Sequence, residues 1–218
     1  MASLEELKQE AHDQRLIRKF LDGIAAIAPY STAVPEAWTT NGKTPISLPE
    51  GFQGLGTVAK DSGYEFGVDS DQEEVEGHGY ASPVRIDMTK TTRSVQMTCL
   101  ETRKSVLEQY YGLDLSKVQP DEQGSIEFNE PETLSRPYSR LVIIGSDGVG
   151  EDQWFWAKIM PRAQVSEVGP HSWNNDASAY ELTFTAFPDP ELGYSVKNII
   201  FGPAAAKNAA AMGFQVQQ

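Results

Sequence analysis

The sequence has very little cysteine and histidine, with one cysteine (Cys99) and three histidines in 218 residues. One cysteine excludes an internal disulfide, and the scattered histidines show none of the spacings of a zinc site. No apolar run approaches the roughly 20 residues that cross a bilayer, and the charged N-terminus lacks the apolar region of a secretory signal. We therefore expect that the protein does not insert into a membrane. The single cysteine also fits synthesis in a reducing cytoplasm.

Basic residues are also scarce, because 18 Lys and Arg stand against 31 Asp and Glu, which gives a net charge of −13. A surface of this charge repels phosphate and argues against a general nucleic-acid binder. It remains compatible with a protein that lies close to nucleic acid without holding it.

The sequence lacks the P-loop, the G-x-S-x-G motif and zinc motifs. Cys99 falls on the apolar side of a predicted strand, which favours a buried thiol over a nucleophile paired with histidine. The acidic run 69–76 resembles the start of a calcium loop but lacks the glycine and the closing glutamate at the required spacing. We expect no enzyme activity, cofactor or metal, although a hydrolase with a carboxylate pair stays an alternative.

The stretch from Arg93 to Gly112 organises the predicted fold. Val95, Met97 and Cys99 alternate with polar residues, as in a strand with one buried face. Apolar residues from position 100 to 111 then follow helical spacing, and Gly112 is suited to end a helix. A strand therefore runs into a short amphipathic helix that needs a sheet to cover.

The remaining chain supplies mostly short predicted strands. They lie at 55–59, 64–68, 83–91, 93–100, 125–129, 179–187 and 194–201, and a hairpin spans 140–165 with its turn at 145–150. The two strands within 83–100 are expected to meet at a polar hinge, Thr89–Thr92. The sum predicts a mainly β fold, a β-sandwich or barrel with one flanking α-helix, plus an N-terminal helical arm.

The N-terminal region predicts an arm over residues 1–49. Ser3 and Glu6 have the form of a capping box, apolar spacing indicates a helix over 3–21, and a proline-rich linker follows from 28 to 49. The helix could pack on its own domain or on a neighbouring subunit. Trp38 in the linker is expected to dock in a pocket of this chain or of a partner. The β domain would then span 50–202, with its helix near 100–112, and a tail 203–218.

Two stretches resemble the major tail (tail tube) proteins of long-tailed bacteriophages, especially those of actinobacterial hosts. The stretch 55–85 reads LGTVAKDSGYEFGVDSDQEEVEGHGYASPVR, and the stretch 96–112 reads QMTCLETRKSVLEQYYG. The similar features are an opening hairpin, an acidic linker, a strand at "PVR", and "ET" before a helix.

This resemblance implies a β-sandwich flanked by a helix and a tail-tube-like structural protein without enzyme activity. Such subunits form hexameric rings that stack into a hollow tube, and DNA passes through the tube without specific binding. The implied partners are further copies of the chain, a tail terminator, distal tail or baseplate proteins, and a tape measure protein inside the tube during assembly. The implied location is the virion tail, with assembly in the host cytoplasm.

A DNA conduit should carry negative charge on its wall, because lysine or arginine there would hold phosphates. We therefore predict that the acidic residues on polar strand faces, Glu65, Asp69 and Asp87, face the lumen. The predicted contacts between rings lie in the arm and the 145–150 turn, at Leu4, Leu7, Trp38, Asp147 and Gly148.

Besides the hydrolase, two further alternatives remain open from the sequence. The first is a carbohydrate- or receptor-binding β-sandwich that uses tryptophans as stacking platforms, namely Trp38, Trp154, Trp156 and Trp173. The second is the tube protein of a related contractile tail or secretion system, which would share the fold.

Overall fold

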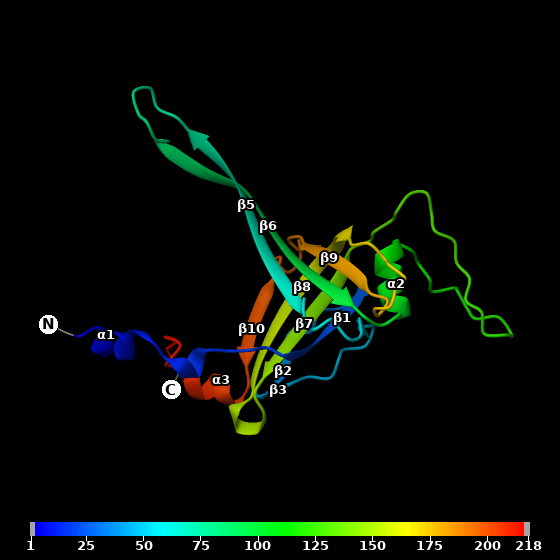
Figure 1. Cartoon of the computed structure of the whole chain (residues 1–218), viewed down its shortest axis with the longest axis horizontal. Helices are drawn as coiled ribbons and strands as arrows, with labels where there is room; N and C mark the ends of the chain where they lie inside the picture. Colours follow the sequence, from blue (N-terminus) through cyan, green and yellow to red (C-terminus); the bar gives the residue numbers. More distant parts are fainter. Residues whose placement is uncertain (1–2, 216–218) are drawn as a thin grey trace.

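One large antiparallel sheet dominates the computed structural model, which describes residues 3–215 (Figure 1). Its strands are β1 (Asp22–Pro29), β4 (Gln53–Gly54), β5 (Tyr64–Val75), β6 (Arg85–Cys99), β7 (Ser139–Asp147), β8 (Trp154–Val168), β9 (Tyr180–Ala186) and β10 (Lys197–Phe201). They follow the order β4-β1-β7-β8-β9-β6-β5, and β10 pairs with the first half of β8. β2 (Thr39–Thr40) and β3 (Thr44–Pro45) form a separate small hairpin.

The described residues also form three short α-helices outside the sheet: α1 (Leu4–Ala11), α2 (Lys104–Tyr111) and α3 (Pro203–Asn208). The predicted mainly β fold with a flanking helix and an N-terminal helix is confirmed. β6 runs into α2 as expected, and Gly112 ends α2 in the left-handed conformation, with φ of 61°. The first two residues of the predicted arm and the last three of the predicted tail lie outside the described residues.

The sheet is apolar on both faces at its centre. Successive residues of β7 point to opposite sides, so Leu141 and Ile143 enter one core while Val142 and Ile144 enter the other. This explains the unbroken apolar run in β7, which is typical of a strand covered on both faces. The larger core also receives Val95, Met97, Cys99, Leu182, Phe184 and the α2 residue Val106.

Cys99 is fully buried in this larger core. Burial, with a smaller effect of the nearby Glu101 charge, raises the pKa of its thiol to about 12. The thiol therefore stays protonated at neutral pH, as expected for a packing residue.

The predicted N-terminal helix over 3–21 is wrong in its length. The capping box of Ser3 and Glu6 forms as predicted, but α1 ends at Ala11 and a short 3-10 turn (Gln14–Leu16) follows. β1 then pairs with β7 over its whole length. The sheet therefore begins inside the segment that the sequence assigned to the arm. β1 covers residues 22–27, which lie between the predicted helix and the predicted linker, and the first two residues of that linker.

The predicted hinge at Thr89–Thr92 is also wrong, because β6 is one continuous strand that pairs with β5 along its length. The register shifts between Asp71 and Gln72 because Thr89 is an extra residue in β6, where it forms a bulge. β5 extends to Val75, so the acidic run 69–74 lies in a strand. No strand forms at 125–129, where the chain is an irregular loop from 113 to 138, and only an isolated bridge from Val58 to Cys99 remains of the strand predicted at 55–59.

Glu101 connects the loop after β4 to the start of α2. Its carboxylate accepts hydrogen bonds from the Thr57 N–H and hydroxyl, both at 2.7 Å, and pairs with Arg103. These hydrogen bonds lower the pKa of Glu101 from 4.5 to about 2. The stabilisation is therefore complete above pH 4.5 and lost as pH falls toward 2.

We expect Glu101→Gln to lower the melting temperature at pH 7 and to match the parent near pH 2. An equal difference at both pH values in thermal scans would contradict this.

Candidate functional site

The hairpin of β5 and β6 projects from the body of the molecule as a long two-stranded ribbon (Figure 1). β6 also pairs with β9, but only from Arg93 to Cys99. Beyond this point the ribbon pairs with no other strand among the described residues. An isolated two-stranded ribbon is marginally stable in water, so both of its faces are candidates for contacts outside the chain.

The register places the predicted lumen residues on one face of this ribbon. Residues opposite each other in an antiparallel pair share a face. Glu65 pairs with Gln96 and Asp69 with Thr92, and Glu73 pairs with Asp87 beyond the bulge. Since positions 65, 69 and 73 of β5 share one side, the structure brings Glu65, Asp69 and Asp87 to a single surface, which we call the polar face.

The polar face continues from β6 onto β9 and β8. Ser94 pairs with Thr185, and Gln96 pairs with Thr183. The Gln96 Nε2 donates to Glu181 Oε1 at 2.6 Å, and the Thr185 hydroxyl donates to the Ser166 Oγ at 3.0 Å. Hydroxyl, amide and carboxylate groups therefore form a connected polar wall across four strands.

The charge of the polar face changes along the ribbon. No lysine or arginine projects from it at 65–71 of β5, 92–98 of β6, 181–185 of β9 or 164–167 of β8, all within the described strands. Lys90 and Arg85 occur only toward the distal end. Arg85 donates to Asp87 at 2.8 Å, which offsets the charge of that carboxylate. Glu65 and Asp69 are exposed and form no ion pair among residues 3–215.

The opposite side of the ribbon, which we call the apolar face, exposes large hydrophobic side chains. Val68 is 65% exposed, Met88 60% and Ile86 53%. Near the body this face belongs to the core through Val95 and Met97, but farther out nothing in the described chain covers it. An uncovered apolar surface of this kind marks a protein–protein contact. Sequence reasoning missed it because the supposed hinge divided β6.

The predicted contacts between rings have different surroundings. Leu4 and Leu7 are exposed on α1, which buries no side chain. Trp38 is 1% exposed and packs edge-to-face on Phe52, with ring centroids 5.7 Å apart. The pocket for Trp38 is therefore in its own chain, and this side chain has no surface to offer another ring.

The turn after β7 holds the base of the N-terminal arm. The Asp147 Oδ2 accepts hydrogen bonds from Arg18 Nη1 and from the Lys19 N–H, both at 3.3 Å. Gly148 is exposed with φ of 75°, and a Cβ there would collide with the Asp152 carbonyl oxygen. Asp147 thus anchors its own chain, while Gly148 remains free at the surface.

The four tryptophans do not form a common platform. Trp38 and Trp154 are buried, whereas Trp156 is partly exposed and Trp173 is 89% exposed on a loop. Two of the four rings are therefore unable to stack on a sugar. Among residues 3–215 there is no group of three or more His, Cys, Asp and Glu arranged to hold a metal. No helix in the same part of the chain is long and apolar enough to span a membrane.

Comparison with known proteins gives a family match that spans β1 to β9. The family described as "Phage tail tube protein" matches residues 12–194. A search of curated proteins gives no match. Among similar solved structures is a chain of the "Cryo-EM structure of the anti-feeding prophage (AFP) baseplate, 6-fold symmetrised". The sequence identity is 10% and the TM-score is 0.36, with 83% of this chain and 93% of that chain covered.

Proposed function

Because the chain belongs to the phage tail tube protein family and is thus a structural component of a tail, we propose that it forms hexameric rings. These rings stack into the tail tube that carries the genome to the host. The observation that supports this best is the amphipathic β5–β6 ribbon, which has one polar and one apolar face and extends away from its own body.

Ring formation would satisfy both faces of the ribbon. The apolar face, with Val68 and Met88, would pack on the adjacent subunit and leave water. The polar face, with Glu65 and Asp69, would then turn toward the axis of the ring. β5 is also an edge strand with unpaired backbone groups, and closure of strands around a ring removes such an edge.

The proposed lumen suits the passage of DNA. Near the body, at 65–71 of β5 and 92–98 of β6, the carboxylates and neutral hydroxyl groups of the polar face offer phosphates no cation to bind, so DNA would slide past this part without being held. Asp87 contributes less negative charge than Glu65 or Asp69, because Arg85 pairs with it. The family is structural, which fits a role without catalysis.

The arm and the 145–150 turn would join successive rings through Leu4, Leu7 and Gly148. In this arrangement the arm is the part of residues 1–49 that precedes β1, the sheet forms the ring wall, and residues 203–218 form the tail. The proposed partners are further copies, a tail terminator, distal tail or baseplate proteins, and a tape measure protein during assembly. The subunit would assemble in the host cytoplasm and end in the virion.

A single substitution on the apolar face tests this proposal. We expect Met88→Asp to prevent rings and tubes, because the contact between subunits would bury an unpaired carboxylate. The measurement is size-exclusion chromatography with negative-stain imaging at rising protein concentration.

The matched control is Thr92→Asp, which adds the same charge on the polar face. We expect this variant to assemble like the parent, since its side chain would face water in the lumen. Equal assembly of the two variants, or a parent that stays monomeric at high concentration, would contradict the proposal.

A further inference from the structure

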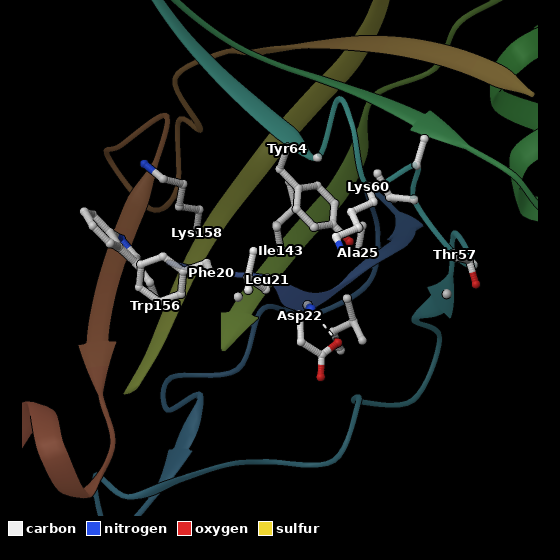
Figure 2. Close-up of a pocket in the computed structure, with 18 of the residues that line it drawn as sticks. Phe20, Leu21, Asp22, Ala25, Thr57, Lys60, Tyr64, Ile143, Trp156 and Lys158 are labelled. Atoms are coloured by element: carbon white, nitrogen blue, oxygen red, sulfur yellow. Dashed lines mark hydrogen bonds between the residues drawn. The ribbon is translucent and has the colours of Figure 1, made fainter. Parts of the chain in front are cut away.

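A large groove opens between the β1 side of the sheet and the base of β5, with a volume of about 910 Å³. Figure 2 shows Ala25 and Ile143 on its sheet side, Tyr64 above them, and Phe20 with Trp156 at one end. It lies between the two ends of the strand order, where the bridge from Val58 to Cys99 joins the segment after β4 to β6. No other segment of the described chain fills it.

The groove combines apolar walls with two lysines. Lys60 and Lys158 form no ion pair with a carboxylate of residues 3–215. The Lys158 ammonium lies 4.4 Å from the centre of the Phe66 ring and donates to the Asn198 Oδ1 at 3.0 Å. Partial burial lowers the pKa of Lys158. Both ammonium groups belong to residues that line the groove.

The acidic groups that line the groove do not neutralise these lysines. The Asp22 carboxylate accepts from the Gly23 N–H at 2.8 Å. The Glu101 carboxylate is bound by Thr57 and Arg103. The groove thus suits a segment that is both apolar and acidic.

α1 has these properties and lacks a binding surface in its own chain. Leu4 and Leu7 lie one turn apart and are 69% and 50% exposed. The helix buries no side chain, although its capping box shows that the sequence specifies a helix at this place. An eight-residue helix is marginal in water without packing. Its charges are mostly acidic, with Lys8 set against Glu5, Glu6 and Glu10.

We propose that the groove of one copy receives α1 of a second copy. The stripe of Leu4 and Leu7 would contact the apolar walls, and the glutamates would lie beside Lys60 and Lys158. This contact rests on the proposed self-assembly and assigns it a donor helix and an acceptor site.

The geometry favours a second copy over the same chain. Asp147 holds Arg18 and the backbone of Lys19, which fixes the direction in which the arm leaves the body. α1 then lies away from the sheet, at the far left of Figure 1. The groove is beside the base of this arm, at Phe20 and Leu21, so the anchored arm points its helix away from its own groove.

Disulfide trapping between two variants tests the proposal. One full-length chain carries Leu7→Cys, and a second chain with a size tag carries Leu21→Cys at the rim of the groove. The native Cys99 is buried and does not interfere. After mild oxidation of the mixture, we expect a heterodimer on a non-reducing gel. The control pairs Leu7→Cys with Leu134→Cys, an exposed position in the 113–138 loop.

A heterodimer yield no higher than the control would overturn the assignment. Tubes in the same preparation would then leave the proposed function standing, whereas a monomeric sample would overturn both. As a second measurement, Lys60→Glu with Lys158→Glu should lower the heterodimer yield several-fold at low salt, with less effect at high salt. The charge-matched pair Lys43→Glu with Lys117→Glu lies outside the groove and should leave the yield unchanged. Equal yields from the two pairs would also overturn the proposal.

Discussion

Replacement of Asp189 by alanine is expected to lower the free energy of unfolding by about 3–5 kcal/mol, because it leaves a buried arginine without its partner. Asp189 is 1% exposed and Arg140 8% exposed, and the two side chains form an ion pair. A loss of this size is a large fraction of the stability of an ordinary domain. Urea denaturation followed by circular dichroism measures it.

The expected size follows from the number of segments that meet at this pair. Arg140 lies on β7, and its Nε donates to the Thr32 carbonyl at 3.1 Å while its Nη1 donates to the Pro161 carbonyl at 2.7 Å. Its guanidinium also lies 4.3 Å from the centre of the Tyr30 ring. The pair therefore connects the turn after β1, the bulged part of β8 and the loop after β9.

The pH dependence gives an independent check on this pair. Burial alone would raise the pKa of Asp189, but the N–H groups of Leu192 and Glu191 and the Arg140 guanidinium outweigh burial and lower it. The stabilisation is therefore present at neutral pH and lost as pH falls through the lowered pKa. The alanine variant should lose less stability on acidification than the parent.

The double replacement Arg140→Met with Asp189→Leu tests whether the loss comes from the unpaired charge or from the packing at these two positions. It should recover much of the loss, since apolar residues of similar volume often replace a buried ion pair without cost. The exposed Asp121, whose carboxylate also accepts backbone N–H groups, provides the control, and Asp121→Ala should change stability little. A loss under about 1 kcal/mol for Asp189→Ala would show that the pair contributes no more than a surface pair does.

The sequence alone predicted the parts of the fold that local pattern determines. β6 leads into α2 as expected, α2 ends at Gly112, and β7 and β8 form the expected hairpin. Alternating apolar residues and turn residues determine these features locally. β1 was missed because its residues, such as Ala25 and Ile27, are small or apolar on both sides. Only the distant partner β7 and the two cores distinguish this segment from a helix.

In the candidate site, too, local sequence pattern predicted some positions, whereas others depend on contacts between segments far apart in the sequence. The two-residue period placed Glu65 and Asp69 on one face, but the position of Asp87 depends on a pairing across the whole hairpin and on a bulge. Thr89–Thr92 was predicted to be a hinge because these residues are polar, whereas the pairing of β5 with β6 makes them part of one strand. The burial of Trp38 against Phe52 depends on how the linker folds over the sheet. The spacing of the residues around Trp38 does not predict this packing.

In the proposed tube, reversal of charge on the polar face is expected to make the wall retain DNA that the parent wall lets pass. The variant changes Asp69, Asp71 and Glu73 to lysine, which places new cations along one face of β5. Six copies around a ring would give DNA many phosphate contacts. The logarithm of the binding constant should then fall with the logarithm of salt concentration by about 0.9 per phosphate contact.

The measurement is the amount of duplex DNA that stays protected from nuclease when tubes polymerise in its presence. The parent should protect almost none, and the triple variant should protect many-fold more at low salt. The matched control reverses the same number of charges in the exposed 113–138 loop, by Glu122→Lys, Glu127→Lys and Glu130→Lys. This loop leaves the body away from the β5–β6 ribbon (Figure 1), so in the proposed ring DNA bound to the control variant would lie on the outside and remain open to nuclease. The tube wall protects DNA from nuclease only when the cations that bind it lie inside the tube. Equal protection by the two variants would therefore place the polar face outside the lumen.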